Sequence, residues 1–240
     1  MALKYKRILL KFSGEALMGN GDFGLDAETL KSVVSQVKSL RDLGVEVGIV
    51  VGGGNIFRGA QIQGSGIQRT TGDHMGMMAT VINALALRDV VESMDMKAHV
   101  LSAMSIEGIA TDGFNANAAK KMLSSGEVVI FAAGTGSPFF TTDTAAALRG
   151  VEIDADIVLK ATKVDGIYTA DPVKDSSATR YQSLTYDEVI QKNLQVMDMT
   201  AFVLCRDHNM SIRVFDMFKE NAVIRIVQGE DEGTLVSTGE

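Results

Sequence analysis

Short apolar runs and helically spaced apolar residues alternate along most of the chain. Runs without polar alternation are typical of strands buried on both faces of a parallel sheet. They predict strands at residues 7–12, 45–51, 98–101, 128–131, 155–160, 212–215 and 223–227. Apolar residues gathered on one helical face predict helices at residues 26–43, 71–94, 115–123, 143–148, 186–191 and 201–208. The acidic tail, residues 229–240, is expected to be loose.

The alternation of strands and helices predicts an α/β fold, with a largely parallel sheet and helices on both of its faces. No Pro-rich or Ser-rich linker, internal repeat or low-complexity run divides the sequence. We therefore expect residues 1–240 to form a single domain.

The segment that follows the strand at residues 128–131 has the features of an anion-binding loop. It begins with residues 134–138, GTGSP, whose glycines let backbone N–H groups approach a ligand. Thr141 or Thr142 can cap the next helix, whose free N–H groups then face the same place. A tight turn with a good cap would explain the glycines and one threonine, but not the threonine pair, Asp143 and the exposed Phe139-Phe140.

Three other predicted strands lead into loops that could bind an anion. The strand at residues 45–51 ends in three glycines and Asn55, and Arg58 follows with a planar donor fork that suits phosphate. Lys11 lies near the end of the first strand, before the Ser13-Gly14 turn, and Lys163 follows the strand at residues 155–160. A surface lysine with its stem on apolar neighbours remains an alternative for Lys11, and a plain loop remains one for the glycines.

These loops should meet at the carboxyl edge of the sheet, where ligands bind in such folds. Lys11, Arg58 and Lys163 supply positive charge there, and Asp143 and Asp171 can orient lysines or hold a metal ion. Phosphoryl transfer requires such groups, because its catalysis is mostly positioning and charge stabilisation. The sequence contains neither G-x-x-x-x-G-K-[ST] nor H-R-D, so it indicates neither a P-loop enzyme nor a protein kinase.

The predicted helix at residues 71–94 has Asp73 in its first turn and a face rich in methionine. Its apolar positions are Met75, Met78, Ile82, Leu85 and Val90. Methionines at helical spacing usually fill a core or a subunit interface, and we prefer that interpretation to a metal site.

Charge and composition exclude several classes of protein. The formal net charge of −7 argues against a nucleic-acid polymer as a partner, because that binding needs a broad basic surface. Cys205 is the only cysteine, and the three histidines have no metal-ligand spacing with it, so we expect no disulfide and no structural zinc. No apolar run approaches the ~20 residues of a membrane span or forms a secretory signal, which predicts a cytoplasmic protein with no membrane partner.

Five strings in order along the chain resemble the bacterial uridylate (UMP) kinases, which belong to the amino-acid kinase superfamily. They are KFSGEAL, VVGGGNIFRG, GDHMGM, AAGTGSPFFTTDTAA and KATKVDGIYTADP, and the similarity runs from about residue 5 to residue 238. The resemblance implies an α/β/α sandwich and cytoplasmic transfer of the ATP γ-phosphate to UMP with Mg²⁺, in pyrimidine nucleotide biosynthesis. It also implies a homohexamer that GTP activates and UTP inhibits.

The resemblance further implies roles for individual residues. Asp143 resembles the superfamily aspartate that aligns the catalytic lysines, which would be Lys11 and Lys163. ATP would be bound by Lys11, Phe12, Ser13, Gly14, Gly54, Arg58, Thr162, Tyr168 and Asp171. UMP would be bound by Gly53, Asp73, Thr135, Gly136, Ser137, Pro138, Phe139, Phe140, Thr141 and Thr142. The resemblance assigns no protein-held metal site.

The segment Gly19, Asn20, Gly21, Asp22, Phe23, Gly24 falls where that family places its GTP-responsive loop. By its letters the segment also matches G-x-G-x-x-G, but it lies well past the first strand. The acidic Glu46 falls at the start of the next strand, not at its end as a dinucleotide fold requires. We interpret the segment as a flexible loop.

Two alternatives stay open at the level of sequence. Another superfamily member that phosphorylates carbamate or an amino-acid carboxylate would share Lys11 and the glycine loops, but would not need Asp73 or the 135–142 loop to hold a nucleotide. The second alternative is a regulatory protein that binds UTP or GTP without catalysing a reaction. The presence of Lys11, Lys163 and Asp143 together argues against this alternative.

Overall fold

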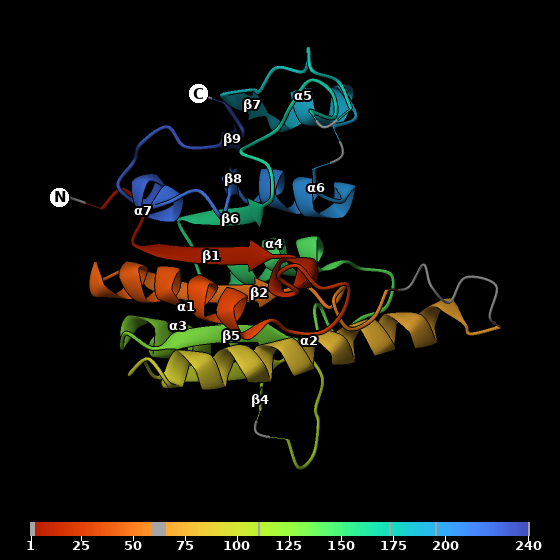
Figure 1. Ribbon diagram of the computed structural model, residues 1–240, viewed down its shortest axis with the longest axis vertical. Helices are drawn as coiled ribbons and strands as arrows, with labels where there is room; N and C mark the ends of the chain where they lie inside the picture. The colour runs from red at the N-terminus through yellow and green to blue at the C-terminus, as the bar shows by residue number, and fades with distance from the viewer. Residues whose placement is uncertain (1–2, 59–65, 110, 173, 195, 240) are drawn as a thin grey trace.

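The computed structural model describes residues 3–58, 66–109, 111–172, 174–194 and 196–239. Within these residues nine strands form one sheet, which Figure 1 shows stacked from β4 at the bottom to β7 at the top. The order is β4-β3-β5-β2-β1-β6-β8-β9-β7, and every neighbouring pair is parallel except β8 and β9. The strands are β1 (Arg7–Phe12), β2 (Glu46–Val51), β3 (Ala98–Ser102), β4 (Asp112–Gly113), β5 (Val128–Ala132), β6 (Ile157–Thr162), β7 (Ser183–Thr185), β8 (Ile212–Asp216) and β9 (Thr234–Ser237).

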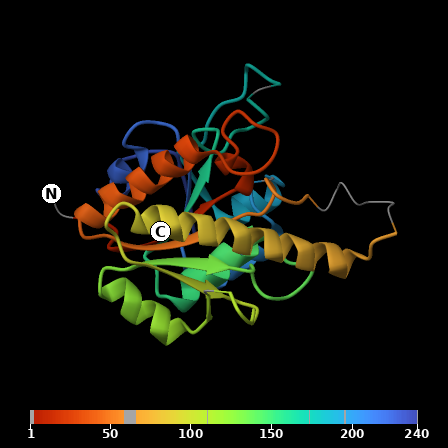
Figure 2. The same ribbon diagram turned by 60° about the horizontal axis from the view of Figure 1, so that its bottom comes forward.

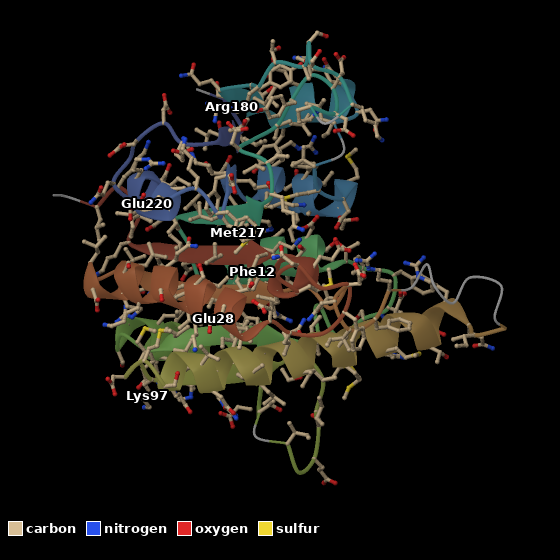
Figure 3. All side chains as sticks on the ribbon, viewed as in Figure 1. Phe12, Glu28, Lys97, Arg180, Met217 and Glu220 are labelled. Carbon is tan, nitrogen blue, oxygen red and sulfur yellow. The ribbon has the colours of Figure 1, made fainter. Side chains whose placement is uncertain are left out.

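Helices cover both faces of this sheet and bury one hydrophobic cluster on each. Helices α1, α2 and α7 pack on one face, where Phe12 and Met217 lie near the middle of the molecule in Figure 3. Helices α3, α4, α5 and α6 pack on the other face. The prediction of an α/β/α sandwich around a largely parallel sheet is confirmed. The helices are the 3₁₀-helix η1 (Gly14–Leu17), α1 (Ala27–Asp42), α2 (Arg69–Glu92), α3 (Ala116–Ser124), α4 (Thr142–Glu152), α5 (Tyr186–Gln191), α6 (Met199–Asp207) and α7 (Ala222–Val227).

Helix α2 begins two residues earlier than the sequence predicts, which moves Asp73 from the first turn into the second. The face predicted to be apolar is only partly buried: Leu85 and Val90 pack against the core, but Met75, Met78 and Ile82 are 39%, 41% and 48% exposed. Met77, Ala84 and Leu87 are among the residues that face the core. Figures 1 and 2 show the N-terminal half of α2 reaching past the carboxyl ends of the strands, so this half can contribute to a site there.

The prediction of a strand at residues 223–227 is wrong, because these residues lie in α7. The β-branched composition favours a strand. However, Val223, Ile226 and Val227 are all buried, and positions three and four apart share one face of a helix. Packing of that face, part of it against α1, decides the local structure in place of propensity.

The prediction of a loose acidic tail is also wrong. Residues 234–237 form β9, which pairs with β8 on one side and β7 on the other. The side chain of Glu232 is only 6% exposed and lies 2.9 Å from the Lys219 ammonium and 2.5 Å from the Arg225 guanidinium. Paired in this way, an acidic residue can be buried just before a strand.

None of the helices in the described parts of the chain has both the length and the hydrophobicity needed to cross a bilayer.

Candidate active site

Two lysines, one buried and one partly buried, and one aspartate meet at the carboxyl edge of the sheet. Lys11 and Lys160 are partners in the register of the adjacent central strands β1 and β6. Alternation along the strands places them on the same face as Leu9 and Val158, which pack in the cluster beneath α4. The ammonium of Lys11 lies 2.6 Å from Asp143 Oδ1, and that of Lys160 lies 2.7 Å from Asp143 Oδ2. We call these three residues the Lys–Asp–Lys cluster.

The cluster carries one excess positive charge in a place shielded from water. Its side chains are only 8%, 15% and 13% exposed for Lys11, Asp143 and Lys160. Burial acts to raise the pKa of the Asp143 carboxyl, but Lys11 and Lys160 outweigh it and hold that pKa below its ordinary value. Burial lowers the pKa of Lys160, and Asp143 only partly offsets this effect. Asp143 is therefore ionised at neutral pH and orients both lysines.

The helix that carries Asp143 is capped as the sequence predicts. Thr141 is the N-cap of α4, and its side-chain oxygen accepts hydrogen bonds from the backbone N–H groups of Asp143 and Thr144. In the preceding loop Gly136 has a φ of 80°, and a Cβ there would lie 2.9 Å from the carbonyl oxygen of Ala103. The close approach and the positive φ both require glycine at this position.

The glycine loops after β1 and β2 pack tightly against their neighbours. A Cβ on Gly14 would lie 2.3 Å from Asn55 Oδ1, and one on Gly53 would lie 2.8 Å from the Cβ of Ala79 in α2. These two glycines therefore have a packing role, whatever they do for a ligand. Arg58 lies beside the second loop, 3.1 Å from the carboxylate of Glu15, and its Nε donates to the Gly54 carbonyl oxygen.

Asp73 connects α2 to the 135–142 loop. Its Oδ2 accepts a hydrogen bond of 2.8 Å from the Phe139 N–H, and Arg69 Nε donates to both of its oxygens at 2.8 and 3.0 Å. Phe139 has a φ of 73°, which is uncommon for a bulky residue. Burial acts to raise the pKa of Asp73, but the Phe139 N–H and Arg69 lower that pKa overall. The carboxylate thus fixes the tip of the loop.

Comparison with known proteins places the chain in a family. The model of the amino acid kinase family matches residues 6–216. This chain belongs to the amino acid kinase family. It is 80% identical over 236 residues to the uridylate kinase of Hydrogenovibrio crunogenus, covering 98% of this chain and 100% of that one. It is 59% identical to the uridylate kinase of Ectopseudomonas mendocina, covering 97% and 94%.

Solved structures of UMP kinases have the same fold as this amino acid kinase. The crystal structure of UMP kinase from Bacillus anthracis superposes with a TM-score of 0.95 at 37% identity, covering 98% of this chain and 97% of that chain. The UMP kinase from Ureaplasma parvum superposes with a TM-score of 0.91 at 36% identity, covering 98% and 100%.

The second lysine on Asp143 in this amino acid kinase is Lys160 and not Lys163, the one expected from the sequence. Lys163 instead lines a cavity of about 600 Å³ together with residues of the 19–24 segment. Strand β6 begins and ends two residues later than expected, so Lys160, predicted as the last residue of the strand, lies two residues before its end. Its spacing from Val158 on the α4 face is the signal that could have identified it. The cavity is lined by Glu15, Ala16, Gly19, Asn20, Gly21, Asp26, Glu28, Thr29, Lys163 and Phe218.

The predicted ATP-binding residues at the end of β6 and after it contact neighbours in the same segment. The Thr162 hydroxyl donates to the Val164 carbonyl oxygen, and the Tyr168 hydroxyl donates to Asp165 Oδ1 at 2.5 Å, which raises the pKa of Tyr168. Asp171 lies 3.4 Å from the Lys174 ammonium. At the other end of the site Phe12 is fully buried, so only its main chain can reach a ligand.

The 19–24 segment of this amino acid kinase forms turns and is held to the glycine loop after β2. The N–H of Gly24 donates to the Asn55 carbonyl oxygen, and Asn55 Nδ2 donates to the Gly24 carbonyl oxygen. Asn55 also exchanges two side-chain hydrogen bonds with Asn83, which is fully buried in α2 and was not singled out from the sequence. The 19–24 segment is thus linked to the glycine loop against which Gly14 packs.

Within the residues that the structure describes, no three His, Cys, Asp or Glu side chains are grouped so that they could hold a metal ion. Both oxygens of Asp143 already contact lysines. This donor set fits a metal ion that is held by the phosphates of a nucleotide better than one that is held by the protein alone.

Proposed function

We propose that the chain is a UMP kinase, which transfers the γ-phosphate of ATP to UMP and gives UDP and ADP. The Lys–Asp–Lys cluster beside the 135–142 loop is the observation that carries the proposal, because it joins fixed positive charge to a loop shaped for an anion. The name and the 80% identity of the relative from Hydrogenovibrio crunogenus support UMP as the acceptor. A cytoplasmic role in pyrimidine nucleotide (CTP) synthesis follows from this reaction.

The chemistry requires no general base. A phosphate oxygen of UMP is already ionised at neutral pH and attacks the γ-phosphorus in line, while the bond from that phosphorus to the bridging oxygen breaks and ADP leaves. Charge grows on the bridging and equatorial oxygens, where the ammonium groups of Lys11 and Lys160 stabilise it. Asp143 holds the lysines in place and takes no proton.

The two nucleotides would bind on either side of this cluster. ATP would contact the main chain at residues 12–14, with Lys11, Gly54, Arg58, Thr162, Tyr168 and Asp171. UMP would contact Gly53, Asp73 and the 135–142 loop. Mg²⁺ would enter with ATP on its phosphates and neutralise part of their charge. Lys163 stays a prediction as a catalytic residue.

Regulation and assembly are part of the same proposal. The 19–24 segment lines a cavity with Lys163, which supports a GTP-responsive element there. Inhibition by UTP would follow from occupation of the UMP site. The exposed face of Met75, Met78 and Ile82 on α2 supports a homo-oligomer, which we propose to be a hexamer.

A coupled assay of ADP release tests the proposal directly. UMP should give the highest kcat/KM among UMP, CMP, dUMP, AMP and carbamate. A higher kcat/KM for CMP or carbamate than for UMP would contradict the assignment of UMP as the acceptor.

A further inference from the structure

One carboxylate joins the starts of two helices beside the Lys–Asp–Lys cluster. Asp198 is the N-cap of α6, and its Oδ1 accepts a hydrogen bond of 2.9 Å from the Ala201 N–H. The same carboxylate also accepts hydrogen bonds from α4. The hydroxyl of the buried Thr144 lies 2.9 Å from both of its oxygens, and the Thr144 N–H lies 3.2 Å from Oδ2. Asp198 therefore does more than cap its own helix.

Residues that precede and follow Asp143 in the sequence both bind to the Asp198 carboxylate. Thr141, which caps α4 and accepts a hydrogen bond from the Asp143 N–H, donates its own hydroxyl proton to Asp198 Oδ2. Thr144 follows Asp143 directly and bonds to the same carboxylate. Because its neighbours on both sides bind one group, Asp143 has little freedom to move with respect to α6.

The loop before Asp198 also holds the second lysine. Lys160 Nζ donates a hydrogen bond to the carbonyl oxygen of Val196, in addition to its contact with Asp143. The segment that ends at Asp198 thus touches Lys160 through its main chain and positions Asp143 through two threonines.

We propose that Asp198 is a positioning residue of the phosphoryl-transfer site, which holds Asp143 and Lys160 in their mutual arrangement. It bonds to threonine hydroxyls and backbone N–H groups, not to the reacting groups, so it acts through its neighbours. The inference rests on the proposed function of the Lys–Asp–Lys cluster. Displacement of catalytic groups by about 1 Å can cost roughly 100-fold in rate, so such a role has a large expected effect.

The charge of Asp198 gives this role a signature that helix capping lacks. Lys160 is faced by Asp143 from α4, by Lys11 from β1 and by Asp198 from the start of α6. Burial lowers the pKa of Lys160, Asp143 raises it, Lys11 lowers it and Asp198 raises it. Removal of the Asp198 charge should lower the pKa of Lys160 further. Because Lys160 acts as an ammonium, the fall of kcat at high pH should then begin at a lower pH.

Asp198→Asn is the informative variant, because asparagine is as good an N-cap as aspartate and preserves α6. We expect kcat to fall by about 10- to 100-fold with little change in the KM for UMP, and the basic limb of the pH profile to move to lower pH. Asp187→Asn removes an exposed carboxylate that pairs with Arg206 of α6, and it should leave kcat and the pH profile unchanged.

A second pair of variants separates the positioning of Asp143 from the effect of the Asp198 charge. The same pair tests the inference if Asp198→Asn does not fold. Thr144→Val removes the hydroxyl but leaves the Asp198 charge, so it should lower kcat without moving the basic limb. Thr144→Ser keeps the hydroxyl and should restore kcat. Wild-type kcat in Thr144→Val would overturn the inference, as would a folded Asp198→Asn enzyme with wild-type kcat and pH profile, even with a lower Tm.

Lys160→Ala in the same assay distinguishes this inference from the proposed function beneath it. If Lys160→Ala loses activity while Asp198→Asn does not, only the positioning role of Asp198 fails. If Lys160→Ala keeps wild-type kcat, the proposed function of the cluster fails, and the role of Asp198 fails with it.

Discussion

Asp143 is the residue on which the candidate site is centred, because each of its carboxylate oxygens contacts a different lysine. Lys11 and Asp143 could be predicted from the sequence, since one ends an apolar strand and the other follows a threonine cap. Lys160 was missed, because the sequence does not show the register of β6 against β1 that places it beside Lys11, and its spacing from Val158 was the only signal on which to choose it. A shift of two residues in a predicted strand end was enough to direct attention to Lys163 instead.

This difference between the two lysines leads to a prediction. Lys160→Ala should lower kcat by ~10²–10³, because it removes one preorganised donor of positive charge. Lys163→Ala should lower kcat much less, since Lys163 lines the neighbouring cavity and Asp143 does not hold it. Steady-state kinetics with UMP and ATP measure both values. A larger loss of kcat for Lys163→Ala than for Lys160→Ala would contradict the assignment.

At the scale of elements, the contact between α2 and the 135–142 loop sets the predicted UMP site. We predict that the Asp73 carboxylate exchanges its hydrogen bond with the Phe139 N–H for hydrogen bonds with the ribose hydroxyls of UMP. Asp73→Ala should therefore raise the KM for UMP and narrow the preference for UMP over dUMP. Arg69→Ala keeps the Asp73 carboxylate and removes only its partner Arg69, which helps to hold the loop. It should therefore raise the KM for UMP and the KM for dUMP by similar factors. An unchanged KM and UMP/dUMP ratio in Asp73→Ala would rule out this role.

The C-terminal elements contain a buried carboxylate, Glu232, which pairs with the more exposed Lys219 and Arg225 and which the sequence did not reveal. Burial acts to raise the pKa of Glu232, but Lys219 and Arg225 outweigh it and lower that pKa overall. Its contribution to stability is therefore present above the ordinary carboxyl pKa of about 4.3 and is lost as pH falls through the lower folded value. Glu232→Gln should cost about 1–3 kcal/mol in the free energy of unfolding at pH 7.

Urea unfolding at several pH values measures this cost. The difference between wild type and Glu232→Gln should shrink as the pH falls below 4. A difference that is the same at pH 7 and pH 3 would show that the charge of Glu232 does not stabilise the fold.

At the scale of the whole molecule, the alternation of strands and helices was enough to predict the layered α/β architecture. It failed at α7 and β9, where packing against α1 and pairing with β7 and β8 override the local sequence. That the whole chain forms a single domain stays a prediction.

The exposed face of α2 is the proposed contact between subunits. Ile82 is 48% exposed beside Met75 and Met78, so Ile82→Glu would place a charge in the proposed contact between subunits. Light scattering should give a hexamer for wild type and a smaller species for Ile82→Glu at the same micromolar concentration. A monomeric wild-type protein would contradict the assembly proposal.

The central claim is that Lys11 and Asp143 act as a unit in the transition state, and a double-mutant cycle on kcat tests it most directly. Lys11→Ala and Asp143→Asn should each lower kcat by ~10²–10³ with a modest change in the KM for UMP. Because Asp143 acts by holding the lysines, the double variant should lose much less than the product of the two single losses. Losses that multiply, or that appear mainly as a raised KM for UMP, would contradict the account.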